Sequence, residues 1–434
     1  MTADNTAEVL RQMDLGAQTS AAHVSSLLET VRLLEPQVQA WAHLDPAAAL
    51  AQAQACDARR LAGGKGPLLG VAVGLKDIVD TADLPTENGT VLHAGRQPTQ
   101  DAALVTRLKQ AGAVIMGKTV TTELATYAPG KTRNPHRLSH TPGGSSSGSA
   151  AAVACGMVPL AIGSQTNGST IRPGAFCGVV SFKPTRASID RTGMLVQSPS
   201  FDTVGLFARS VADVALLWGV LAHPMQPTQG HTAHGPAAPA ASAAPLPPRL
   251  VWMPGPLRDR FEPGVEALLL GRASAWGAAL GPADLPRGMQ ALVDLHRLIM
   301  EAEIARHFAR EYATGAAQLS ASLRGQIERG GQTSEPELNA ARSQLASMQS
   351  AVDAWMQAES IDAWVTASAP GPAPLGLQAT GDPIFCTAAT ALDLPALQIP
   401  GLTAPNGLPL GIQVVGRRGS DAQLLAIASQ WLQP

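Results

Sequence analysis

Apolar and polar positions alternate along the first 120 residues at spacings that predict both helices and strands. Helical periodicity built on Ala, Leu and charged residues predicts helices over residues 19–34 and 46–62. Further on, the apolar segments 70–77 and 113–119 enclose a helical segment at 101–112, which gives the order strand, helix, strand. Such alternation favours an α/β sheet.

The middle of the chain contains a helix-forming segment of small residues and a polar stretch. Residues 149–155, SAAAVAC, predict a helix that ends at Gly156, and its lack of bulk predicts close packing against other backbone. The run VPLAIGS predicts a buried strand that leads into residues 163–178, GSQTNGSTIRPGAFCG. That stretch gathers hydroxyl, amide and guanidinium side chains around Gly168 and Ser169, which raises the question of a nucleophile surrounded by backbone amides.

In the last third of the chain, six apolar residues recur at alternating intervals of three and four: Leu338, Ala341, Leu345, Met348, Val352 and Trp355. They predict one apolar face of a helix that packs as core or covers the sheet. Ser334 and Glu337 fit a capping box at its start. Residues 362–374 and 391–401 again have the patterns of strands and loops, so we expect the C-terminal third of the chain to rejoin the same sheet.

The segment 235–248, GPAAPAASAAPLPP, interrupts this pattern because its Pro and Ala content prevents a packed element. It predicts an exposed linker, which is either a domain boundary or a surface excursion. The length of 434 residues fits one large α/β domain or two to three ordinary ones.

The composition narrows the classes of partner. With 15% charged residues and a formal net charge of −2, nothing favours nucleic acid or an anionic membrane surface, so a small neutral or singly charged partner is expected. The four cysteines lie far apart without a CxxC pattern, which predicts neither disulfides nor a zinc site. Residues 1–16 lack the features of a secretory signal, and no apolar run approaches the roughly 20 residues of a membrane span, so we expect a cytoplasmic protein.

Residues 112–119, GAVIMGKT, match the P-loop pattern GxxxxGK[ST]. A P-loop wraps phosphate with flexible backbone after a strand, whereas the four variable positions here are the apolar strand itself. We therefore predict no nucleotide site; Gly112 ends a helix, and Lys118 and Thr119 end a strand.

Residues 144–148, GSSSG, match the nucleophile elbow of α/β-hydrolases with Ser146 at the centre. That fold needs an acidic residue and then a histidine later in the chain, usually near its end. The last histidine is His307, so a Ser-His-Asp triad stays open only with a histidine between His223 and His307.

Three segments each place one base or nucleophile among small residues: GLKD around Lys76, TPGGSSSGSAAAVACG around Ser145, and GSQTNGSTIRPGAFCG around Ser169. Together they closely resemble the signature region of the amidase signature family, serine hydrolases that cleave amides through a Ser-Ser-Lys triad. The resemblance covers most of the chain: it runs from GPLLGVAVGLKD to VVSFKPT and returns at GDPIFCTAATALDLPALQIPG and GLPLGIQVVG.

The resemblance implies a role for each of these residues. Lys76 takes the place of the family's lysine, Ser145 that of the bridging serine held by a cis peptide, and Ser169 that of the nucleophile. It also implies an α/β fold with a large mixed, twisted sheet covered by helices on both faces. We expect a single domain over residues 1–434, with the core signature at about 65–190 and a variable helical cover at about 260–358.

The chemistry of these residues is coherent without the family. Serine needs a base, and only His136 and His140 lie near these segments, where they precede the glycines. A lysine serves as a base only when neutral, so its pKa must fall from about 10.4 to near 7, which burial can produce. The apolar run before Lys76 fits that burial. Taken alone, Lys76 would more often pair with a carboxylate such as Asp77, so the three segments carry the prediction jointly.

The turn before the nucleophile predicts an oxyanion hole formed by the backbone N–H groups of Thr166, Asn167 and Gly168. Many family members have TDTGGSIR where this chain has SQTNGSTIR. Asn167 therefore stands at a common glycine position, although Asn tolerates unusual backbone angles better than most residues. Gln165 stands where Asp is common, which removes a charge near the nucleophile.

Three side chains are candidates for substrate binding: Arg172, Gln165 and Tyr127. Arg172 lies three positions after the nucleophile instead of two, as in the malonamidase branch, where this arginine holds the substrate's carboxylate. A guanidinium matches a carboxylate with two parallel hydrogen bonds. The alternative is that Arg172 braces the loop.

The sequence thus predicts an amidase that hydrolyses a linear amide, or a carbamate- or urea-like C–N bond, through an acyl-enzyme on Ser169. We expect no metal or organic cofactor and a small-molecule partner; the oligomeric state stays open, with a homodimer as one option. One alternative is an amidotransferase subunit that delivers ammonia to a charged transfer RNA. A second is a non-catalytic ligand-binding protein with the same fold.

Overall fold

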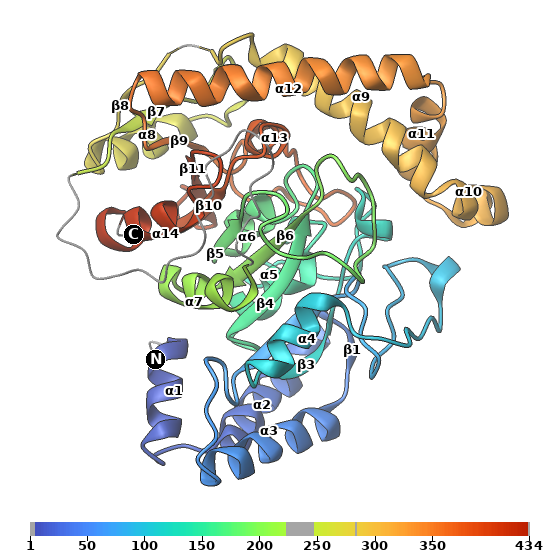
Figure 1. Cartoon of the computed structure of the whole chain (residues 1–434), viewed down its shortest axis with the longest axis vertical. Helices are drawn as coiled ribbons and strands as arrows, with labels where there is room; N and C mark the ends of the chain where they lie inside the picture. The colour runs from blue at the N-terminus through green and yellow to red at the C-terminus, as the bar shows by residue number, and fades with distance from the viewer. Residues whose placement is uncertain (1–4, 223–246, 283, 433–434) are drawn as a thin grey trace.

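The computed structural model describes residues 5–222, 247–282 and 284–432. An 11-stranded mixed sheet runs through the molecule in the order β1-β3-β2-β4-β6-β5-β10-β11-β9-β7-β8, and Figure 1 shows it surrounded by helices. The strands are β1 (Trp41–Leu44), β2 (Ala72–Lys76), β3 (Val114–Thr119), β4 (Leu160–Gln165), β5 (Val180–Lys183), β6 (Thr203–Ala208), β7 (Leu250–Trp252), β8 (Ala279–Leu280), β9 (Ala363–Ala367), β10 (Ala396–Thr403) and β11 (Pro409–Gly416).

The helices cover both faces of this sheet. They are α1 (Thr6–Asp14), α2 (Ser20–Val38), α3 (Pro46–Leu61), α4 (Ala103–Gln110), α5 (Ser147–Ala154), α6 (Ile171–Cys177), α7 (Val211–Leu221), α8 (Val265–Ala275), α9 (Met289–His307), α10 (Ala309–Gly315), α11 (Ala321–Gly330), α12 (Glu335–Ala358), α13 (Ile384–Ala391) and α14 (Asp421–Trp431), with short 3-10 turns at Val91–His93, Glu123–Ala125, Arg258–Arg260 and Ala316–Gln318.

Alternate residues of the strands point into different apolar cores. Along β9, Ala363 and Val365 belong to a core shared with α4, α7, α8 and α14, whereas Trp364 belongs to one shared with α9, α11, α12 and α13. A third core joins α2, α3 and α5 to Ala72 and Val114. The period-2 alternation of strand side chains therefore gives each face its own helical layer, as the sequence predicted for the fold class.

The centre of the sheet positions the site. β2 pairs in parallel with β3 on one side and with β4 on the other. Because parallel strands end at the same edge, Lys76 at the end of β2 and Gln165 at the end of β4 come together there. Open α/β sheets bind ligands outside the carboxyl ends of their strands.

Local signals predicted these elements well. The capping box at Ser334 and Glu337 is present at the start of α12. The P-loop match is indeed a strand: Gly112 follows α4 with φ of +88°, and buried Lys118 donates from Nζ to Val79 O and Thr86 Oγ1. Most of the Pro/Ala segment at 235–248 lies outside the described residues.

Candidate active site

Lys76 lies fully buried at the carboxyl end of β2. Its Nζ is 2.6 Å from Ser145 Oγ and 2.8 Å from Ser164 Oγ. The carboxylate of Asp77 lies instead 3.8 Å from Lys118 Nζ. Burial lowers the pKa of Lys76 well below its usual value, although the more distant Asp202 opposes this. The geometry therefore places an amine with a lowered pKa in contact with two serine hydroxyls.

Ser145 immediately precedes the small-residue helix. The Gly144–Ser145 peptide bond is cis, and Ser145 is 1% exposed. Two residues later α5 begins, with Gly148 packed so closely that a Cβ there would lie 2.2 Å from Ala40 O. Small side chains are thus required for α5 to approach the backbone of its neighbours, and this approach places Ser145 beside Lys76.

Ser169 lies in the loop between β4 and α6 and is partly exposed. Its carbonyl accepts a hydrogen bond of 3.3 Å from the Ser146 N–H, which joins this loop to the one that carries Ser145. Within the described residues, the Ser169 hydroxyl has no hydrogen-bond partner. The structure therefore brings the three predicted residues to one edge of the sheet and leaves the Ser169 oxygen free to meet a ligand.

The loop before Ser169 has its carbonyls bonded and its amides free. Thr166 O accepts from His296 Nε2 at 2.9 Å, Asn167 O from Thr390 Oγ1 at 2.6 Å, and Gly168 O from Arg172 N at 3.0 Å. In the part of the chain that is described, the backbone N–H groups of residues 166–169 donate no hydrogen bond. Such a row of unpaired donors beside a serine is what an oxyanion hole requires.

Gln165 has a structural place. It is fully buried; its Oε1 accepts from the N–H groups of Thr170 and Ile171, and its Nε2 donates to Thr390 Oγ1. These contacts cap the start of α6. Both ends of the Gln165 amide therefore bond to the protein, and a contact of Gln165 with substrate stays a prediction.

Arg172 braces two loops around the site. It is 1% exposed and donates from Nε to Thr380 O at 2.7 Å and from Nη2 to Gly144 O at 2.7 Å. Its Nη1 is buried without a partner in the described structure, and a Cβ on Gly168 would lie 3.1 Å from it. Burial lowers the pKa of Arg172 from its usual value. Most of the donors of Arg172 therefore hold the two loops together, as the bracing alternative predicted.

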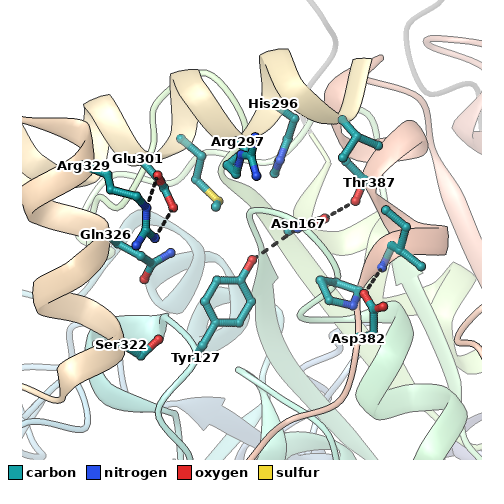
Figure 2. Close-up of a pocket in the computed structure, with 14 residues that line it drawn as sticks. Tyr127, Asn167, His296, Arg297, Glu301, Ser322, Gln326, Arg329, Asp382 and Thr387 are labelled. Atoms are coloured by element: carbon teal, nitrogen blue, oxygen red, sulfur yellow. Dashed lines mark hydrogen bonds and ion pairs between the residues drawn. The ribbon is translucent and has the colours of Figure 1, made fainter. Parts of the chain in front are cut away.

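Asn167 uses its side chain to connect two walls of a pocket. Its Nδ2 donates to Tyr127 Oη at 3.3 Å, and its Oδ1 accepts from Thr387 Oγ1 at 2.8 Å. Figure 2 shows Asn167 between these two residues and bonded to both. The asparagine therefore fixes the loop more firmly than a glycine would.

The pocket beside Asn167 has a volume of about 260 Å³. Helix α9 covers it, α11 closes one side and α13 the other (Figure 2). Glu301 forms an ion pair of 2.6 Å with Arg329 in its wall. Its lining residues are Tyr127, Asn167, Val293, His296, Arg297, Met300, Glu301, Ser322, Gln326, Arg329, Asp382, Pro383, Ile384 and Thr387. The size fits a small ligand, and the predicted residue Tyr127 does line it.

Ser146, the central serine of the nucleophile-elbow match, has a structural role. Ser146 is fully buried, and its Oγ donates to Ser164 O and accepts from Ser164 N, both at 3.2 Å. His136 contacts Cys177 O instead of a serine. The described residues include no group of three or more His, Cys, Asp or Glu side chains that could hold a metal ion.

Sequence reasoning missed Ser164, His296 and Thr390. Ser164 had a weak signal as a hydroxyl at the end of a buried apolar strand. His296 and Thr390 had none, because they reach the loop from positions 130 and 223 residues away from their partners.

Comparison with known proteins identifies the family. The family model described as Amidase matches residues 22–425. The chain is 31% identical to a glutamyl-tRNA(Gln) amidotransferase subunit of Chloroflexus aggregans, over 96% of this chain and 93% of that protein. Among solved structures, the peptide amidase of Stenotrophomonas maltophilia is 28% identical with a TM-score of 0.83, covering 99% of this chain and 96% of the other. A structure described as a vestigial complex that reveals the origins of an s-triazine catabolic enzyme is 25% identical with a TM-score of 0.89, covering 98% and 97%.

A mixed α/β sheet with this signature defines a class of enzymes that act on carbon–nitrogen bonds, as hydrolases or as amidotransferases. The chain belongs to the amidase signature family. None of the helices within the described residues is both long enough and apolar enough to cross a membrane.

Proposed function

We propose that this protein hydrolyses a linear C–N bond of a small amide, or of a carbamate- or urea-like substrate, through an acyl-enzyme on Ser169. The observation that carries the proposal is the fully buried Lys76 Nζ, 2.6 Å from Ser145 Oγ, in a site where the neighbouring Ser169 is free. No step needs a metal or an organic cofactor.

In the first step, Ser169 Oγ attacks the substrate carbonyl carbon and its proton passes to Ser145 Oγ. The proton of Ser145 passes in turn to Lys76 Nζ, which can accept it because burial favours the neutral amine. Ser145 stands just before the N-terminus of α5, whose dipole favours negative charge on this oxygen.

The carbonyl oxygen becomes an oxyanion that the N–H groups of Thr166, Asn167 and Gly168 can stabilise. Loss of one such donor typically raises the barrier by about 3 kcal/mol. As the tetrahedral intermediate collapses, Lys76 returns a proton through Ser145 to the leaving nitrogen. A water molecule then attacks the acyl-enzyme with the same groups acting as base, and Ser169 is released.

Labelling with a fluorophosphonate or sulfonyl fluoride, followed by peptide mass spectrometry, tests the nucleophile. We expect one adduct on Ser169, lost in Ser169→Ala and retained in the matched control Ser200→Ala. Labelling at Ser146, or turnover that persists without any adduct, would remove the assignment. A panel of short amides, aryl amides, carbamates and ureas would then identify the bond that is cleaved.

An amidotransferase subunit is the second candidate, because the curated relatives include glutamyl-tRNA(Gln) amidotransferase subunits that match almost the whole chain. Its discriminator is whether the purified chain alone turns over small amides. A non-catalytic binding protein is the third, and it would be supported if Ser169→Ala bound ligand and matched the parent in every turnover assay.

A further inference from the structure

The three residues before Ser169, residues 166–168, all have their backbone carbonyls hydrogen-bonded. Those of Thr166 and Asn167 are bonded by side chains, His296 Nε2 at 2.9 Å and Thr390 Oγ1 at 2.6 Å. Only the carbonyl of Gly168 is bonded by backbone that is close in sequence. Two distant helices, α9 and α13, therefore determine how the first two peptide groups are oriented.

A trans peptide group points its C=O and the following N–H in opposite directions because the six atoms are coplanar. Fixing Thr166 O on His296 therefore fixes the direction of the Asn167 N–H. Fixing Asn167 O on Thr390 does the same for the Gly168 N–H. Both of these N–H groups lack a partner within the described residues, and both belong to the predicted oxyanion hole.

His296 is built to hold one position and one protonation state. It is 1% exposed, and its ring centroid lies 4.4 Å from that of Phe201. Burial lowers the pKa of His296 to about 4, so the ring is neutral near pH 7 and carries one N–H. Since its partner is a carbonyl oxygen, that hydrogen lies on Nε2.

We propose that His296 is a positioning residue for the oxyanion hole: by binding the Thr166 carbonyl, it aims the Asn167 N–H at the developing oxyanion. The inference rests on the proposed function. Thr390 has the same role for the Gly168 N–H. Because α9 also covers the pocket beside Asn167, one helix both lines this pocket and orders the donors of the proposed oxyanion hole.

The test uses His296→Phe, which keeps an aromatic ring against Phe201 but loses the donor, and His296→Gln, which can restore one. With a small amide that wild type hydrolyses, we expect His296→Phe to lower kcat roughly 10- to 100-fold and change KM less than about threefold. His296→Gln should recover most of kcat. The rate of phosphonylation of Ser169 should fall in parallel, because that adduct also places an oxygen in the hole.

The matched control is His23→Phe. His23 is another buried histidine, it lies on α2, and its pKa is also lowered to about 4. This substitution should leave kcat and the labelling rate unchanged. Thr390→Val, which removes the hydroxyl at nearly constant volume, repeats the test at the next carbonyl and covers the case in which His296→Phe fails to fold.

Unchanged kcat in His296→Phe and Thr390→Val, with wild type labelled at Ser169, would overturn this inference alone. A loss of kcat that follows the loss of thermal stability and is not rescued by His296→Gln would also overturn it, since that pattern indicates packing. Failure of wild type to be labelled at Ser169 would instead overturn the proposed function, and the inference with it.

Discussion

Lys76 differs from the other buried lysines of the described chain in what its amine contacts. Lys118 donates to Val79 O and Thr86 Oγ1 and lies 3.8 Å from the Asp77 carboxylate, and Lys183 donates to a backbone carbonyl. Burial lowers the pKa of each of these two lysines to about 8. Lys76 faces two hydroxyls, and burial lowers its pKa well below its usual value. Both hydrogen-bond partners of Lys76 are serine hydroxyls, which can exchange protons with a neutral amine, whereas Lys118 and Lys183 also donate to carbonyls, which cannot.

The pH dependence of turnover should report this base. We expect kcat/KM to rise with pH as Lys76 loses its proton and to level off well below pH 10.5, because its pKa is depressed. Lys76→Met should lower kcat by roughly 10²- to 10⁴-fold and abolish this acidic limb. An acidic limb that survives in Lys76→Met would assign the titration to another group.

Arg172 has most of its donors bound to Gly144 and Thr380. We therefore expect Arg172→Ala to reduce turnover of acidic and neutral amides by similar factors, because the loops on which the serines lie lose their brace. Competition between a paired acidic and neutral substrate measures this. If turnover of the acidic amide alone collapsed, the partnerless Nη1 would be the group that holds a carboxylate, as the family resemblance implies.

Helix α5 shows how strongly an element can depend on one small residue. A Cβ on Gly148 would lie 2.2 Å from Ala40 O and 2.3 Å from Val120 N, and neither backbone atom can easily move. Gly148→Ala should therefore destabilise the protein by about 1–3 kcal/mol or more, measured as the free energy of unfolding in urea.

Gly219 provides the matched control. It is an exposed glycine within α7, and an added Cβ there meets nothing within 4 Å. Gly219→Ala should stabilise by roughly 0.5–1 kcal/mol, because Ala favours a helix interior. Equal effects of the two substitutions would show that close packing of α5 is not required.

Elements with strong local signals were predictable, and contacts between them were not. The Ser334 and Glu337 cap and the apolar run that becomes β4 depend on neighbours within a few residues. The bond between His296 and Thr166 depends on how α9 lies over the end of the sheet. No periodicity near His296 distinguishes a histidine that hydrogen-bonds to this loop from any other buried histidine.

At the scale of the whole molecule, two of the buried histidines, His23 and His296, couple stability to pH. Burial lowers the pKa of His23 and of His296 to about 4, whereas an unfolded histidine titrates near 6.5. The folded state therefore binds fewer protons between these values. Its stabilisation by the neutral rings is present above about pH 6.5 and is lost as the pH falls towards 4.

We expect each histidine to contribute a loss of about 1–2 kcal/mol in the free energy of unfolding between pH 7 and pH 5. Urea denaturation of wild type, His23→Phe and His296→Phe measures this, and each variant should show a smaller loss than wild type. Buried Asp77 and Asp421 have raised pKa values and act in the opposite direction, so the difference between variants is the decisive quantity. Parallel curves for all three proteins would contradict the prediction.

The sequence by itself determined the family, the alternation that builds the sheet, and the three residues of the proposed triad, because small-residue loops and apolar strands are local patterns. Tertiary structure alone decided what each side chain touches: that Asp77 pairs with Lys118, that Gln165 bonds to Thr390, and that Asn167 bonds to Tyr127 and Thr387. The physical reason is that hydrogen bonds act over about 3 Å, and segments distant in sequence come that close only when the cores on both faces of the sheet have packed.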